Sequence, residues 1–199
     1  LKAHYPAEFL AAVVTNQGGY YSAYAYLSEA RRMGIRVLLP DINHSGFEYR
    51  GYRDRILMGF IRIQTLREKS IEALLNERKR GEFTSLGEFL QRTDIPFSDV
   101  KTLIKAGCFD RLEPGRSRPE LIYAAMEHEY RQSHSNTLTR VHGDDSKKPV
   151  FPELSLRDKV RMELECFGFP VSEHPLDKYE WYLKGKTIKA KVNQSPWRV

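Results

Sequence analysis

The sequence has few of the features that mark a secreted scaffold or a membrane protein. Only two cysteines, Cys108 and Cys166, occur in 199 residues, and neither belongs to a CxxC pair. This spacing argues against a disulfide framework and against a zinc site. No apolar run approaches a membrane span, and no signal-peptide pattern opens the chain. We therefore expect two buried thiols, a reducing cytoplasmic location and no membrane partner.

Patterns of catalysis and metal binding are also missing. The six histidines show neither HxH nor HxxxH spacing, and there is no Gly-rich phosphate loop, nucleophile elbow or convincing carboxylate pair. The nearest approach to a metal cluster is His142 with Asp144 and Asp145, which stand in a polar stretch where solvated charge is commoner. We predict no catalytic residue, no metal ligand and no cofactor here, so an independent metal-dependent nuclease is poorly supported.

The composition that remains is globular and mildly basic. Hydrophobic residues make up 41% of the chain and aromatic residues 12%, which suits one or two small folded domains. The 32 Lys+Arg against 26 Asp+Glu give a net charge of +6. That excess is consistent with a polyanionic partner, but the positions of the basic residues must decide.

Apolar periodicity and capping signals predict a mainly α chain with a small β-hairpin. The hairpin is predicted from residues 47–50 and 56–60 around a turn at 51–54, after a short apolar run at 35–39 that is rich in β-branched residues. Residues 133–154 have no periodicity and predict a flexible linker. The predicted helices span residues 6–15, 22–33, 66–80, 85–92, 98–106, 119–132 and 155–166. Ser85 and Glu88 are predicted to form a capping box, and Ser98 to cap the next helix. In that helix we expect three residues to face inward: Val100, Leu103 and Ile104.

One short polar stretch resembles half of an ion-binding loop. Asp41, Asn43 and Ser45 alternate after Pro40, but the further ligands and the glycine placement of a calcium loop are missing. The stretch therefore predicts a turn that is held by bonds from side chains to the backbone.

Four stretches together resemble the catalytic (alpha) subunit of bacterial DNA polymerase III, a C-family polymerase. They are Leu1–Phe9, Glu29–Ser45, Leu103–Asp110 and Glu163–Leu176, and they follow one another in the family's order. The resemblance implies an excised piece of a DNA-directed DNA polymerase. The family's catalytic palm, with its aspartates and magnesium, then lies before the point that matches Leu1, and the clamp-binding motif lies after the region covered here.

The resemblance also implies a domain order. Residues 1–46 would be the helical end of a fingers-like region, and residues 47–132 a tandem helix-hairpin-helix domain with flanking helices. Residues 133–154 would be the linker, and residues 155–199 a helix that leads into an OB-like region.

A helix-hairpin-helix motif holds DNA without reading its sequence, because a tight turn aims the N–H groups of a helix N-terminus at a phosphate. The first predicted hairpin lies within residues 62–70 and has no glycine, although the family usually carries one near Arg67. Its candidate phosphate contacts are Thr65, Arg67, Lys69 and Ser70. A plain helix start with solvated charges is an equally good interpretation.

The second predicted hairpin, residues 106–118, has glycines and a following helix. Its candidate phosphate contacts are Lys105, Gly107, Arg111, Arg116 and Arg118, and Phe109 and Leu112 are predicted to be core residues. A surface turn with scattered charge is the bland alternative. Over residues 62–118 there are 12 Lys+Arg and 9 Asp+Glu, a net charge of only +3, so we expect weak binding that gains avidity from neighbouring domains.

The leading hypothesis is a non-catalytic segment that grips the backbone of duplex primer–template without sequence specificity. The implied partners are duplex DNA, the neighbouring polymerase domains and, through the parent chain, the sliding clamp and other replisome subunits. The rival is a helical scaffold or protein-interaction module of the same polymerase with no DNA contact. The equivalent segment of an error-prone paralogue fits the sequence as well.

Overall fold

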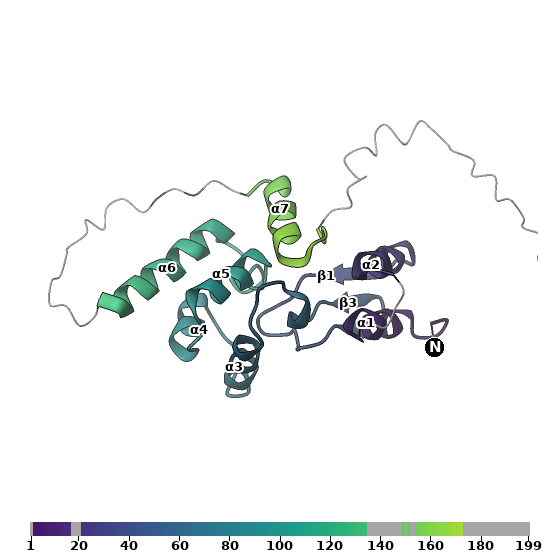
Figure 1. Ribbon diagram of the computed structural model, residues 1–199, viewed down its shortest axis with the longest axis horizontal. Coiled ribbons are helices and arrows are strands. Elements are labelled where there is room, and N and C mark those ends of the chain that lie inside the picture. Colours follow the sequence, from purple (N-terminus) through teal and green to yellow (C-terminus); the bar gives the residue numbers. More distant parts are fainter. Residues whose placement is uncertain (1, 17–20, 135–148, 150, 152–153, 173–199) are drawn as a thin grey trace, which may run out of the picture.

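The computed structural model describes residues 2–16, 21–134, 149, 151 and 154–172. In this part of the chain, seven α-helices and one 3-10 helix accompany a three-stranded sheet (Figure 1). The sheet with α1 and α2 forms one end of the molecule, and α3 to α6 gather at the other, with α7 above the junction (Figure 1). The predicted mainly helical fold class is confirmed.

The sheet consists of β1 (Arg36–Leu38), β2 (Arg50–Tyr52) and β3 (Arg55–Leu57), in the order β1-β3-β2. The predicted hairpin is present, but its strands lie closer to the turn than expected. Gly51 and Tyr52 belong to β2, because Arg53 takes a left-handed φ of 53° and closes the chain within two residues. The third strand, β1, pairs in parallel with β3 and joins residues on both sides of the predicted boundary at 46/47.

Helices α1 (Pro6–Asn16) and α2 (Ala23–Arg32) match their predictions closely. The Ser22 hydroxyl accepts a hydrogen bond from the N–H of Ala25 and caps α2. Gly34, with φ of 79°, ends the following turn in the left-handed conformation. Helix α1 packs on β2 and β3, and α2 packs on β1.

The other end of the molecule contains the helices α3 (Glu68–Arg78), α4 (Leu86–Arg92), α5 (Phe97–Lys105) and α6 (Arg118–His134). All four were predicted, from periodicity or from signals at the start of the helix. The predicted cap of α5 is wrong: Pro96 is the N-cap residue and Ser98 lies inside the first turn, since proline's fixed φ already suits a helix entry. In the same helix Val100, Leu103 and Ile104 face inward, as predicted.

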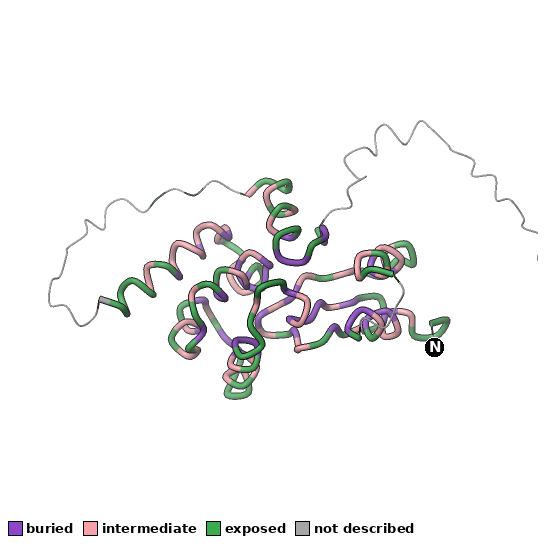
Figure 2. The backbone as a smooth tube through the Cα atoms, viewed as in Figure 1, coloured by how far each residue is buried: buried purple, intermediate pink, exposed green. Residues whose placement is uncertain are grey.

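The core of this end is aromatic and continuous with that of the sheet. The rings of Phe83 and Phe89 meet edge to face at 5.0 Å, and those of Phe89 and Phe109 at 5.1 Å. Phe89 and Phe109 have no exposed surface, so the interpretation of Phe109 as a core residue is confirmed. Figure 2 shows the buried backbone running along the inner side of these helices and through the sheet.

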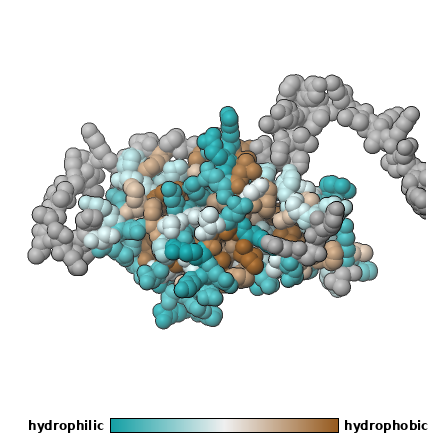
Figure 3. All heavy atoms as spheres, viewed as in Figure 1, coloured by the Kyte–Doolittle hydropathy of each residue, from teal (hydrophilic) through white to brown (hydrophobic). Residues whose placement is uncertain are grey.

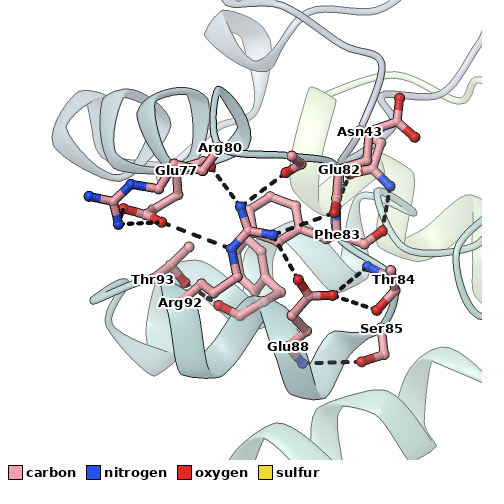
Figure 4. Close-up of polar contacts among 12 residues, drawn as sticks. Asn43, Glu77, Arg80, Glu82, Phe83, Thr84, Ser85, Glu88, Arg92 and Thr93 are labelled. Carbon is pink, nitrogen blue, oxygen red and sulfur yellow. Dashed lines mark hydrogen bonds and ion pairs between the residues drawn. The ribbon is translucent and has the colours of Figure 1, made fainter.

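A single arginine closes the loop between α3 and α4 (Figure 4). The Arg92 guanidinium donates to the carbonyls of Glu77 and Gly81 at 2.7 and 3.0 Å, and it stacks 4.5 Å from the ring centre of Phe83. It also forms an ion pair with Glu88 at 2.8 Å. The planar fork of arginine suits several carbonyls at once, so Arg92 fixes the chain reversal between α3 and α4.

Glu88 shows a variation on the predicted capping box. The Ser85 hydroxyl accepts from the N–H of Glu88, as expected, but the Glu88 carboxylate turns back to both the N–H and the hydroxyl of Thr84 (Figure 4). Hydrogen bonds from Thr84, with the ion pair to Arg92, lower the pKa of Glu88 to about 2. The carboxylate therefore stays charged over the physiological range.

The loop at residues 41–45 joins the two ends of the molecule. Asp41 accepts from the N–H groups of Asn43 and His44, and the Ser45 hydroxyl donates to the carbonyl of Met58 at 2.7 Å. The side-chain amide of Asn43 both donates to and accepts from the backbone of Phe83, at 2.8 and 2.9 Å. The predicted turn with bonds from side chains to the backbone is confirmed, and it ties the sheet to the α3–α4 loop.

Helix α7 (Leu156–Phe167) lies where a helix over residues 155–166 was predicted. Ser155 is its N-cap, and Gly168, with φ of 78°, ends it. Its buried Glu163 accepts from the N–H groups of Val171 and Ser172 at 2.6 and 2.8 Å, and so it holds the turn that follows. Both cysteines are free and buried, as expected, and burial raises the pKa of Cys166 to about 11. Within the described residues, no helix combines the length and the apolar character of a membrane span.

Candidate nucleic-acid interface

The first hairpin connects the 3-10 helix Phe60–Arg62 to α3 through residues 63–67. It contains no glycine, yet Thr65 takes the left-handed conformation with φ of 65°. This conformation strains a β-branched residue, so the hairpin keeps a glycine-like turn without glycine. Thr65, Arg67 and Lys69 are exposed, and the surface over α3 is hydrophilic in Figure 3.

A carboxylate of the protein itself occupies the N-terminus of α3. Asp99, on α5, accepts from the hydroxyl of Ser70 at 2.5 Å and from Nε of Arg67 at 3.0 Å, and more weakly from the Arg67 N–H at 3.4 Å. Burial raises its pKa, but the bonds from Arg67 and Ser70 outweigh that effect and hold the pKa below its ordinary value. Asp99 is thus an anion bound at a helix N-terminus, the place where a phosphate was expected.

The position of Asp99 corrects the predicted phosphate contact of Ser70 and limits that of Arg67. Ser70 is buried, with 5% of its surface exposed, and its hydroxyl is bonded to Asp99. It therefore supports the fold and is not available to a phosphate. Arg67 is engaged by Asp99, but its side chain remains 54% exposed, so its outer edge faces solvent. The side chain of Lys69 makes no hydrogen bond or ion pair with any of the described residues.

The second hairpin, residues 106–117, connects α5 to α6 and is built around Gly107 and Arg118. Gly107 has φ of 83°, and a Cβ placed on it would lie 2.5 Å from Nη2 of Arg118. Arg118 is 3% exposed, forms an ion pair with Asp110 at 2.5 Å and donates to the carbonyl of Lys105 at 2.8 Å. The glycine therefore gives room to an arginine of the protein.

The predicted phosphate roles of Gly107 and Arg118 are corrected accordingly. The close approach that glycine allows is taken up by the guanidinium of Arg118, and that guanidinium is sealed inside the fold. Burial lowers the pKa of Arg118, but the bond to Asp110 outweighs it and leaves the pKa raised. Arg118 holds the carboxyl end of α5, where a cation is favourable to the helix dipole.

The remaining candidates of this hairpin differ in availability. Lys105 pairs with Glu165 of α7 at 2.7 Å, and Arg116 pairs with Glu120 at 3.1 Å. A phosphate would have to displace these carboxylates. Arg111 is exposed and has no hydrogen bond or ion pair within the described part of the chain.

Two missed residues explain most of these corrections. Asp99 binds Arg67 and Ser70 of the first hairpin, and Asp110 binds Arg118 of the second. The sequence predicted no role for either carboxylate. Asp99 is 32 residues from Arg67. The sequence signal was limited to the position of Asp99 in the first turn of a predicted helix.

The described residues offer no metal site at this interface. Among the described residues, no group of three or more His, Cys, Asp or Glu side chains is arranged to hold an ion. His142, Asp144 and Asp145 lie outside the described residues, as do the linker from 135 to 148 and the stretch from 173 onward.

Comparison with known proteins agrees with this architecture. Residues 34–119 match the family described as the helix-hairpin-helix motif. The chain is 35% identical over 193 residues to the DNA polymerase III subunit alpha of Thermus aquaticus, and 33% identical over 192 residues to that of Aquifex aeolicus. These alignments cover 90% and 94% of the chain. The chain belongs to the DNA polymerase III alpha family and matches a fragment of that subunit.

The alignments cover nearly all of this chain but only a small fraction of each relative. The alpha subunit of Pseudomonas fluorescens aligns with 100% of the chain at 30% identity. The chain nevertheless spans only 15% of the Thermus subunit and 16% of the Aquifex subunit. Family and motif together indicate a segment of the polymerase III alpha subunit that contains a helix-hairpin-helix motif.

Proposed function

We propose that this chain is the segment of a bacterial replicative polymerase that grips the phosphate backbone of duplex primer–template, without sequence specificity and without catalysing transfer. Nucleotide transfer and its magnesium belong in this proposal to the palm of the parent subunit, in the cytoplasm. Contacts to the sliding clamp and to other replisome subunits likewise come through the parent chain.

The observation that carries the proposal is the exposed turn before α3. The backbone of Thr65 is left-handed at the tip of this turn, and the side chains of Arg67 and Lys69 are exposed where the helix begins. Hydroxyl, guanidinium and ammonium groups around a helix N-terminus are the groups that contact DNA phosphates. With Arg111 on the second hairpin, these residues replace the longer set that the sequence predicted.

The internal pairing of cations limits the expected strength. Arg118 is sealed inside, and Lys105 and Arg116 are already paired with carboxylates. About three phosphate contacts remain, which predicts a slope of log K against log salt near −3. The same pairing favours the second candidate function, a helical scaffold whose basic residues serve packing and which does not touch DNA.

The test is fluorescence anisotropy of the 199-residue chain with two labelled duplexes of unrelated sequence, over a salt series. We expect weak and equal binding to both duplexes. Lys69→Glu should weaken both equally and reduce the slope by about 1. The matched control is Arg131→Glu on α6, whose side chain is 77% exposed and remote from either hairpin along the chain.

Two results would decide for the scaffold. One is the absence of binding at low salt. The other is a Lys69→Glu variant that binds with the slope of the unmodified chain while remaining folded by circular dichroism.

A further inference from the structure

One face of the small sheet is covered and the other is open. Gly51 and Ile56 are register partners and share a face with Val37. Helix α1 packs on that face so closely that a Cβ on Gly51 would lie 2.3 Å from the backbone of Ala7. Ile56 is fully buried there. Since side chains alternate along a strand, the remaining strand residues project from the opposite face.

The open face combines arginines with apolar and aromatic side chains. Leu38 is 38% exposed and Tyr52 55% exposed, so this face presents large apolar and aromatic side chains to solvent. Together with the second hairpin this face lines a groove of about 410 Å³, to which Arg111 and Gly107 contribute. The residues of the open face are Arg36, Leu38, Arg50, Tyr52, Arg55 and Leu57.

The groove carries net positive charge. Arg36 and Arg55 share a single carboxylate, Asp54, at 2.6 and 3.3 Å. Arg50 and Arg111 have no ion pair among the described residues.

Both acids that line the groove are already bound. Asp41 accepts from two backbone N–H groups and from the ring of His44, and Asp110 is paired with Arg118. Hydrogen bonds leave the Asp41 carboxylate charged, whereas the charge of Asp110 is matched by Arg118. The arginines of the groove and its rim, Arg36, Arg50, Arg55 and Arg111, therefore still outnumber the acids Asp41 and Asp54.

Tyr52 gives the groove a second property. Its ring lies on the open face, and the guanidinium of Arg53 lies over the ring, 5.1 Å from its centre. A stacking base would use the other face of the ring or displace that guanidinium. An exposed aromatic ring in a basic groove is the arrangement on which unpaired bases stack while arginines neutralise the backbone. The bases of a duplex are stacked on one another, so a duplex offers no free base that could stack on such a ring.

We propose that this groove binds single-stranded nucleic acid, with an unpaired base stacked on Tyr52 and phosphates on Arg50, Arg55 and Arg111. The site is separate from the turn before α3 and does not require that turn to bind a duplex, although Arg111 belongs to both proposals. The apolar floor of Leu38 and Leu57 suits the flat face of a base better than the wet backbone of a duplex.

The test measures anisotropy of the 199-residue chain with a labelled oligothymidylate and with an abasic oligonucleotide of the same length. We expect the oligothymidylate to bind and the abasic strand to bind about tenfold more weakly, because stacking is lost. Tyr52→Ala should lose the same factor on oligothymidylate and nothing on the abasic strand. Arg50→Glu should weaken binding of both strands, and Arg131→Glu of neither.

Duplex binding by Tyr52→Ala separates this site from the turn before α3: it should equal that of the unmodified chain. The proposal is overturned if oligothymidylate does not bind, which would leave the open face to a neighbouring polymerase domain. It is also overturned if the abasic strand binds equally well, or if folded Tyr52→Ala retains full affinity for oligothymidylate.

Discussion

The two hairpins of this protein are closed by ion pairs of opposite orientation. In the first, the buried partner is the acid: the side chain of Asp99 is 4% exposed, whereas that of Arg67 is 54% exposed. In the second, the buried partner is the base: the side chain of Arg118 is 3% exposed, whereas that of Asp110 is 39% exposed. The first hairpin therefore shows a guanidinium to solvent, and the second shows a carboxylate.

This reversal indicates that the two hairpins are not equivalent as phosphate sites. A polyanion meets Arg67 and Lys69 at the first hairpin, but at the second it meets Asp110 beside Arg111. The more glycine-rich hairpin thus has the poorer electrostatic surface for a duplex, because its arginine Arg118 is buried and its carboxylate Asp110 is partly exposed. Sequence composition ranks the two hairpins in the opposite order.

The largest expected effect comes from removing the buried base of the second hairpin. Arg118→Ala should lower the free energy of unfolding by about 3 kcal/mol, because it leaves the carbonyl of Lys105 and the Asp110 carboxylate without their partner. Urea denaturation measures the loss. Arg116→Ala in the same hairpin is the control and should cost less than about 1 kcal/mol, since that arginine is half-buried at the surface. Equal losses would show that Arg118 does not hold the hairpin.

The next effect concerns the glycine under that arginine. Gly107→Ala should cost about 2 kcal/mol, because φ of 83° is unfavourable for an L residue and the new methyl group would press on Arg118. The control is Gly115→Ala, where a Cβ meets nothing within 4 Å. Thermal unfolding of both variants measures the difference. A Gly107→Ala variant as stable as Gly115→Ala would contradict the described turn.

A smaller effect should follow from neutralising the buried acid of the first hairpin. Asp99→Asn should lower the free energy of unfolding by about 1.5 kcal/mol at neutral pH, because charged hydrogen bonds become neutral ones. The folded pKa of Asp99 lies below the ordinary 3.8, so its contribution is complete above that value and is lost as the pH falls through the folded pKa. The gap between parent and variant, measured in urea from pH 7 downward, should therefore narrow below pH 3.8. A gap that stays constant into acid would exclude a charge effect.

The smallest effect has the opposite sign. Thr65→Gly should raise the free energy of unfolding by about 0.5 kcal/mol, because relief of the left-handed strain slightly exceeds the extra chain entropy of glycine. Urea denaturation measures the change. Thr65→Gly introduces glycine at a left-handed position of the first hairpin, whereas Gly107→Ala removes glycine from such a position in the second, so the two variants should change stability in opposite directions. A loss of stability in Thr65→Gly would mean that the hydroxyl or the methyl group of Thr65 supports the turn.

The sequence by itself determined the local elements. Apolar periodicity and capping signals located α1 to α7 to within a few residues, and Ser85 caps α4 as predicted. The turn at residues 41–45 was also predictable, because its bonds join neighbouring residues. The family followed from four short stretches. Each of these features depends on residues that are close in sequence, where spacing alone carries the information.

Only the tertiary structure decided which charges face outward. Arg67 and Arg118 looked alike in sequence, but Asp99 arrives from another helix and Asp110 folds back across a turn. The parallel pairing of β1 with β3, which creates the open face around Tyr52, likewise joins strands 19 residues apart. The physical reason is the same in both cases: burial and long-range pairing depend on which elements pack together, and spacing along the chain does not record it.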